Sequence, residues 1–165
     1  MHKYITMRYL PINHKLFTEN RRAFVNRIKG NDIAVFNAND IMPTNADGSM
    51  PFKQNSDLFW LSGIDQEESV LVVAPNQPDE NMREILFLKE TNKNIAIWEG
   101  AKLSKDEAFN VSGIKTVYWL DQLDEKLKQI IAKSDAIYLN KNLHSRSDSK
   151  VETRDDRFRQ IIIDR

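Results

Sequence analysis

The first hydrophobic pattern along the chain is an apolar stripe at helical spacing, formed by Phe17, Phe24, Val25 and Ile28. The stripe predicts a helix that Asn13 caps and that ends near Lys29, because Gly30 follows. Its basic residues Arg21, Arg22 and Arg27 fall off the stripe, so we expect them on the outer side of the helix.

Short apolar runs further along the chain predict strands; they span 32–37, 58–61, 70–74, 85–89, 114–119 and 136–139. Residues 94–98 are weaker and predict either an edge strand or an extended lead into Glu99-Gly100. A turn covers 75–80, and a long irregular stretch covers 38–55. So long a loop in a compact domain is typical of either a functional or a disordered segment.

Two more helices follow from local start and stop signals. Ser104 and Glu107 have the spacing of a capping box, which predicts a helix that ends near Gly113. Asp121 is expected to cap another helix that reaches about Lys133. The central strands read as hairpins and the final elements as an alternation of helix and strand, so we expect a mixed sheet covered by helices.

Composition narrows the class of protein. The chain has 165 residues and no cysteine, which excludes disulfides, thiolate metal sites and a cysteine nucleophile. Its apolar runs are too short to cross a membrane, and the first fifteen residues lack the apolar centre of a secretory signal. We therefore expect one cytoplasmic globular domain with no membrane partner.

The formal net charge is zero, but the charge is unevenly distributed. Residues 1–30 carry +6, residues 31–140 carry −8 and residues 141–165 carry +2. The basic first helix raises the alternative of a nucleic-acid binder. We favour a solvated helix on an acidic body and expect no nucleic-acid partner, because no stacking aromatics are interleaved with these charges.

The sequence contains none of the common catalytic motifs. There is no glycine-rich phosphate loop and no nucleophile elbow, and the three histidines His2, His14 and His144 have no metal-ligand spacing. The carboxylate pairs at 67–68, 79–80 and 155–156 read as solvated turns, because adjacent side chains point apart. We therefore expect no catalytic residue, no metal ligand and no cofactor within this chain.

One stretch, Asn45–Gly63, is denser in polar and aromatic residues than a generic domain needs. Lys53, Gln54 and Asp57 offer donors and acceptors on a loop, where recognition residues commonly sit. The alternative is that Asn55, Ser56 and Asp57 only end a turn while the apolar run 58–61 fills the core.

Two ordered motifs resemble one family. Residues 51–63 read PFKQNSDLFWLSG and residues 97–103 read IWEGAKL, and both are similar to segments of the N-terminal domain of Xaa-Pro aminopeptidases, the aminopeptidase P, prolidase and creatinase group. Lys53 stands where that family usually has Arg. The resemblance covers most of residues 13–140.

The resemblance implies a three-layer α/β fold, ribonuclease H-like, with a mixed, mainly parallel six-stranded sheet flanked by helices. It divides the chain into an aminopeptidase P N-terminal-like domain at 1–140 and a charged linker at 141–165. That linker is expected to lead to a C-terminal pita-bread catalytic domain absent from this chain, which in the family holds two divalent metals, often manganese, and removes an N-terminal residue preceding proline. The chain alone is expected to be inactive.

The family role of such a domain is to support oligomerisation and to wall the active-site entrance. The resemblance thus implies substrate-entrance candidates at Trp98, Lys53, Gln54 and Asp57, with a homo-oligomer, the protein's own catalytic domain and a proline-containing peptide as partners. An indole at Trp98 suits a proline ring, although it can equally pack within its own domain. The alternative is a free-standing module that uses the same fold to bind a peptide or a protein.

Overall fold

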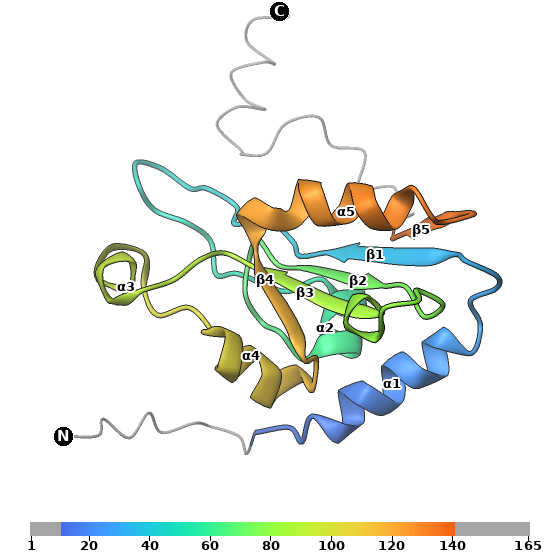
Figure 1. Ribbon diagram of the computed structural model, residues 1–165. Helices are drawn as coiled ribbons and strands as arrows, with labels where there is room; N and C mark the ends of the chain where they lie inside the picture. Colours follow the sequence, from blue (N-terminus) through green and yellow to red (C-terminus); the bar gives the residue numbers. More distant parts are fainter. Residues whose placement is uncertain (1–10, 141–165) are drawn as a thin grey trace, which may run out of the picture.

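Helices cover both faces of a central β-sheet, which gives the molecule three layers (Figure 1). The computed structural model describes residues 11–140, apart from the side chain of Trp98. The predicted linker 141–165 and the carboxylates Asp155 and Asp156 lie outside the described residues.

The sheet in residues 11–140 has five strands in the order β4-β3-β2-β1-β5: β1 (Ile33–Asn37), β2 (Val70–Val73), β3 (Glu84–Leu88), β4 (Thr116–Trp119) and β5 (Ile137–Leu139). Strand β2 is antiparallel to both of its neighbours, whereas β5 is parallel to β1 and β4 is parallel to β3. Four strands therefore run in one direction, and only β2 runs against them.

The helices divide between the two faces. On one face lie α1 (Lys15–Val25), α2 (Ser56–Ser62) and α4 (Lys105–Ser112), and on the other lies α5 (Leu123–Ile131). Two hydrophobic clusters correspond to these faces. One contains Leu71 and Leu86, and the other contains the residues that directly follow them in the sequence, Val72 and Phe87. Alternation along each strand thus feeds two cores, as expected for a sheet covered on both sides.

Three short elements lie in the connections between these strands and helices. They are α3 (Lys93–Glu99) and two 3₁₀ turns, η1 (Glu80–Met82) and η2 (Leu120–Gln122). Figure 1 shows α3 at the edge of the molecule, beyond the helices that cover the sheet.

The mixed three-layer α/β fold confirms the expected fold class, with two differences. The described residues hold five strands rather than the implied six, and parallel and antiparallel pairings occur twice each. The ribonuclease H-like assignment stays a prediction.

Two predicted extended segments are wrong, because both are helices. The run 58–61 lies in α2, where the Asn55 side chain accepts hydrogen bonds from the backbone N–H groups of Asp57 and Leu58. Residues 94–98 lie in α3, where Asn92 caps in the same way. Each helix has only seven residues, too few for its apolar residues to show a helical period.

Other details of the helix predictions are also wrong. Helix α1 follows His14 without a side-chain cap and ends at Val25 rather than near Lys29. Asp121 lies in η2 and does not cap α5, which begins at Leu123 without a side-chain cap. Arg21 does not face outward from α1, because its side chain is completely buried. The capping box of Ser104 and Glu107 is confirmed at the start of α4.

Arg21 of α1 connects its helix to three further elements, α2, α4 and β3. Its Nη1 donates hydrogen bonds to the carbonyl oxygens of Leu61 (2.8 Å) and Ser112 (3.0 Å), in the last turns of α2 and α4, and its Nε pairs with Glu84 at 3.0 Å. Burial lowers the pKa of Arg21, and the carboxylate of Glu84 counteracts that shift. A cation at the two helix carboxyl ends satisfies carbonyls that the helices leave unpaired.

Candidate functional site

Three irregular segments meet at one end of the sheet. Strands β1 and β3 are parallel, so the loop 38–55 and the segment 89–103 leave the sheet at the same end. The turn at 66–68 enters the antiparallel strand β2 there. Carboxyl ends of parallel strands commonly carry binding sites, so this end is the candidate site.

The buried side chain of Gln54 connects the end of the loop 38–55 to the segment before β2. Its buried amide donates through Nε2 to the carbonyl oxygens of Ile64 (3.1 Å) and Gln66 (2.8 Å), while its Oε1 accepts from the backbone N–H of Asn55 (2.7 Å). One side chain therefore ties the start of α2 to the segment before β2. A buried amide whose bonds are all to backbone atoms acts as a structural strut.

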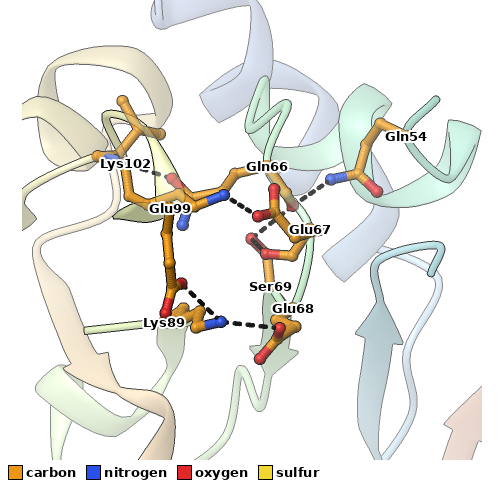
Figure 2. A network of polar contacts seen from close by, with 9 residues as sticks. Gln54, Gln66, Glu67, Glu68, Ser69, Lys89, Glu99 and Lys102 are labelled. Carbon is orange, nitrogen blue, oxygen red and sulfur yellow. Dashed lines mark hydrogen bonds and ion pairs between the residues drawn. The ribbon is translucent and has the colours of Figure 1, made fainter. Parts of the chain in front are cut away.

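The turn Gln66–Glu68 is held on its inner side by two buried side chains, those of Gln54 and Ser69. The buried Ser69 hydroxyl donates to the Gln66 carbonyl oxygen at 2.8 Å, beside the bond from Gln54 (Figure 2). Glu68 has a φ of 51°, a left-handed conformation that costs a residue other than glycine about 1–3 kcal/mol. Such strain persists only where neighbouring contacts impose it.

The outer side of the same turn holds the segment 89–103. The Gln66 Oε1 accepts from the backbone N–H of Leu103 at 2.8 Å, and this bond fixes the orientation of the amide. The carboxylate of Glu67 forms an ion pair with Lys102, and both side chains are largely buried. The Gln66 Nε2 is buried without a hydrogen-bond partner among the described residues, so a donor remains available there.

Lys89 completes the arrangement at the end of β3. Its Nζ lies 3.3 Å from the Glu68 carboxylate and 2.8 Å from that of Glu99, the last residue of α3 (Figure 2). The hydrogen bond with Glu99 raises the pKa of Lys89, with a smaller contribution from Glu68. Both ends of the segment that contains α3 are thus tied to one three-residue turn.

The segment itself presents apolar surface. Ile97 in α3 is 74% exposed. The chain leaves α3 at Gly100, whose φ of 80° and ψ of 169° are open to glycine almost alone. In the loop that follows β1, Ile41, Met42 and Met50 are also exposed, and a hollow of about 370 Å³ lies between this loop and the turn. This end of the sheet therefore offers scattered apolar side chains around a polar turn.

The structure separates the predicted site residues. Gln54 lies inside the network, and Trp98 belongs to α3, with its side chain outside the described residues. Lys53 and Asp57 are exposed, and their hydrogen bonds run through the backbone, to Asn39 and Asn55. Lys53 borders a separate apolar hollow of about 490 Å³ with Leu16 and Trp60.

Glu67 and Lys102 were missed by the sequence analysis. The pair Glu67-Glu68 was interpreted as a solvated turn, which is wrong for Glu67, because its side chain is buried against Lys102. The partner lies 35 residues away, so no local spacing connects the two. The only available signal was their position, because Glu67 lies shortly after the motif 51–63 and Lys102 lies within the motif 97–103.

Residues 11–140 contain no group of three or more His, Cys, Asp or Glu side chains placed to hold a metal ion. None of their helices is both long enough and apolar enough to span a bilayer.

Comparisons with known proteins identify relatives. The chain is 26% identical over 127 residues to an Xaa-Pro aminopeptidase of Escherichia coli, which covers 77% of this chain and 29% of the relative. It is 23% identical over 118 residues to an Xaa-Pro aminopeptidase of Haemophilus influenzae, covering 72% and 27%. The chain thus spans under a third of the length of these two relatives.

Solved structures share the fold. The aminopeptidase PepP of Pseudomonas aeruginosa superimposes with a TM-score of 0.74 at 21% identity, over 93% of this chain and 32% of the other. A putative aminopeptidase P from Bacillus anthracis gives 0.73 at 23% identity, over 93% and 36%. The family profile described as "Aminopeptidase P, N-terminal domain" matches residues 17–138. The chain belongs to the aminopeptidase P N-terminal domain family.

Proposed function

We propose that this chain is the non-catalytic N-terminal domain of a metal-dependent, cytoplasmic Xaa-Pro aminopeptidase, a peptidase that removes an N-terminal residue preceding proline. The observation that carries the proposal is the family match across residues 17–138, together with relatives of which the chain spans under a third. The partner is then the protein's own C-terminal catalytic domain, in a homo-oligomer.

The metals in this proposal belong to that catalytic domain. The described residues do not fit a two-metal centre, because no three candidate ligands converge in residues 11–140. A zinc-substituted aminopeptidase P of Escherichia coli in complex with product shares the fold of this chain, with a TM-score of 0.71. We assign two divalent ions, manganese, to the catalytic domain, where they would activate the attacking water.

Within the domain, we assign the substrate entrance to α3 and the adjoining loop. The exposed Ile97 and the neighbouring Trp98 are suited to cover the apolar ring of a proline, which demands no particular sequence. The candidates Lys53, Gln54 and Asp57 differ in how they contribute: Gln54 supports the site from inside, and the other two offer exposed charges. Oligomerisation would bring this end of the sheet toward a neighbouring active site.

The decisive experiment compares the chain with its natural reading frame. If the frame continues past Arg165 into a domain with Asp, His and Glu metal ligands, the full-length protein with manganese should cleave an X-Pro peptide, and residues 1–165 alone should not. Cleavage by the 165-residue chain would overturn the division of roles. A stop codon after Arg165 would favour the free-standing binding module instead.

The entrance role of Trp98 has its own test in the full-length protein. Trp98→Ala should raise KM for X-Pro peptides by about fivefold or more without lowering the melting temperature, because a contact with substrate is lost and no core residue is removed. Tyr138→Ala is the matched control, since Tyr138 is half exposed on β5, which Figure 1 shows on the opposite side of the molecule from α3. A large loss of stability in Trp98→Ala would place the indole in the core and contradict the role.

A further inference from the structure

The segment 89–103 is attached to the rest of the domain at its base, and every described polar attachment of that base involves the turn Gln66–Glu68 or Lys89 (Figure 2). Leu103 and Lys102 are held at one end and Lys89 at the other. Between these ends lies α3, which Figure 1 shows beyond the layers of the fold. The position of α3 therefore depends on a small number of contacts.

These contacts differ in strength. Glu67 and Lys102 have side chains only 11% and 13% exposed, so water and salt screen their attraction weakly. Lys89 and its two carboxylates are 34–50% exposed, so these two ion pairs are screened more strongly. The Glu67–Lys102 pair is consequently the main electrostatic attachment of α3.

The turn is rigid enough to serve as an anchor. Its Gln66 carbonyl accepts from both Gln54 and Ser69, two buried side chains, and Glu68 keeps a left-handed backbone conformation. A strained backbone that is held from inside is typical of positions where the chain must present side chains in one geometry. Here the presented side chains are those that grip the segment 89–103.

We infer that Glu67 and Lys102 are positioning residues for the substrate entrance: their ion pair sets where α3 stands relative to the sheet, and thereby how α3 meets a proline-containing peptide. This inference rests on the proposed function, because it adds to the entrance role of α3 the pair that orients it. Neither residue needs to touch the substrate.

The structural arm of the test uses the full 165-residue chain, which has no cysteine and so can be labelled at chosen sites. Ile97→Cys and Lys128→Cys place spin labels on α3 and on the exposed side of α5. Pulsed electron–electron double resonance should give one narrow distance distribution in the doubly labelled protein that keeps Glu67 and Lys102. Glu67→Gln and Lys102→Met should each broaden or shift it, and the exchange Glu67→Lys with Lys102→Glu should restore it.

The control is Glu80→Gln, which removes an exposed ion pair with Arg83 at the other end of β3 and should leave the distribution unchanged. Melting curves establish that each variant folds. Two single variants are used because each removes the pair from a different side. An unchanged distribution in both folded single variants overturns the inference.

The kinetic arm uses the full-length aminopeptidase. Both single variants should raise KM for X-Pro peptides about fivefold with kcat within about twofold, and the exchanged pair should recover KM, which a merely structural loss does not predict. A displaced α3 with unchanged KM overturns the positioning role. If the full-length protein has no Xaa-Pro activity, the proposed function fails and with it the entrance role, whereas the label distances still report whether the pair holds α3.

Discussion

The junction at Arg21 and the base of α3 both use a cation to hold separate elements together, yet they do different work. Arg21 is completely buried and binds the ends of α2 and α4 and the start of β3. Lys102, which is largely buried, and Lys89, which is about one third exposed, attach a projecting segment to one turn. Because Arg21 is buried among core elements, we expect it to stabilise the whole fold. The contacts of Lys102 and Lys89, in contrast, position the segment that contains α3 without supporting the core.

The largest expected effect separates the two regions by stability. Arg21→Met should lower the free energy of unfolding by about 3–5 kcal/mol, because it leaves Glu84 and two helix-end carbonyls without their shared donor. Urea unfolding measures the loss. The neighbouring Arg22 is exposed, so Arg22→Met should stay within about 0.5 kcal/mol.

If Arg21→Met does not fold, Arg21→Lys provides the second measurement. A single ammonium does not reproduce the fork of the guanidinium, so we expect a loss intermediate between those of the Met and control variants. A Lys variant as stable as the parent would show that charge alone matters at the junction.

A second comparison uses one glycine from each region. Gly63, with a φ of 71°, ends α2, and an added Cβ would collide with the Phe17 ring; Gly100 has a comparable φ of 80° but open space around it. Gly63→Ala should therefore cost about 2–4 kcal/mol from strain and overpacking. Gly100→Ala should cost only the backbone strain, about 1–2 kcal/mol. Equal losses in thermal unfolding would contradict the distinction between body and projection.

The capping box at the boundary between the regions gives a smaller, pH-dependent effect. Ser104→Ala should lower stability by about 1 kcal/mol at pH 7. Hydrogen bonds from the Ser104 backbone and hydroxyl lower the pKa of Glu107 below its ordinary 4.5. Its contribution is thus present above that value and is lost as the pH falls through the lowered pKa.

Unfolding curves from pH 7 to pH 3 check this prediction. The parent should lose more stability toward acid than Ser104→Ala does, because the variant loses the hydroxyl bond to the Glu107 carboxylate and keeps only the bond from the backbone N–H of residue 104. Asp106→Asn changes a charge in the same turn but leaves the box intact, so it should lose less than Ser104→Ala at pH 7. Identical acid profiles for parent and Ser104→Ala would contradict the role of the box.

The smallest effect is expected at Lys89. Lys89→Met should lower stability by less than about 1 kcal/mol, and 1 M salt should remove most of the difference, because these pairs are partly exposed. The raised pKa of Lys89 means that its stabilisation is complete below 10.5 and is lost as the pH rises through the raised value. Around neutral pH, the stability difference between Lys89→Met and the parent should therefore not change with pH. A salt-independent loss as large as that of Arg21→Met would erase the contrast between the regions.

Much of the fold was predictable because its signals are local. The strands β1, β2 and β3 follow from apolar runs between turns, and the helix α4 follows from its capping box. The short helices α2 and α3 were not predicted, although each carries a signal: Asn55 stands eight residues before Gly63, and Asn92 stands eight residues before Gly100. Cap and stop residues outweigh a short apolar run.

The candidate site was predictable only in outline. The two motifs indicated Gln54 and the region of Trp98, but nothing local indicated that the turn at Glu67 joins them. Adjacent charges before a strand are typical of a solvated turn, and only a partner distant in sequence makes one of them a buried anchor. The same reason explains why Arg21 was expected on the surface.

By itself, the sequence determined the mixed α/β class, because apolar periodicity, turns and caps act over a few residues. Its two motifs indicated the family by their resemblance to known members. Only the tertiary structure decided which charges are buried and which segments project. Arg21 and the Glu67–Lys102 pair became anchors when folding brought together residues 35 to 91 positions apart, since a charge is stable inside a protein only where its partners converge.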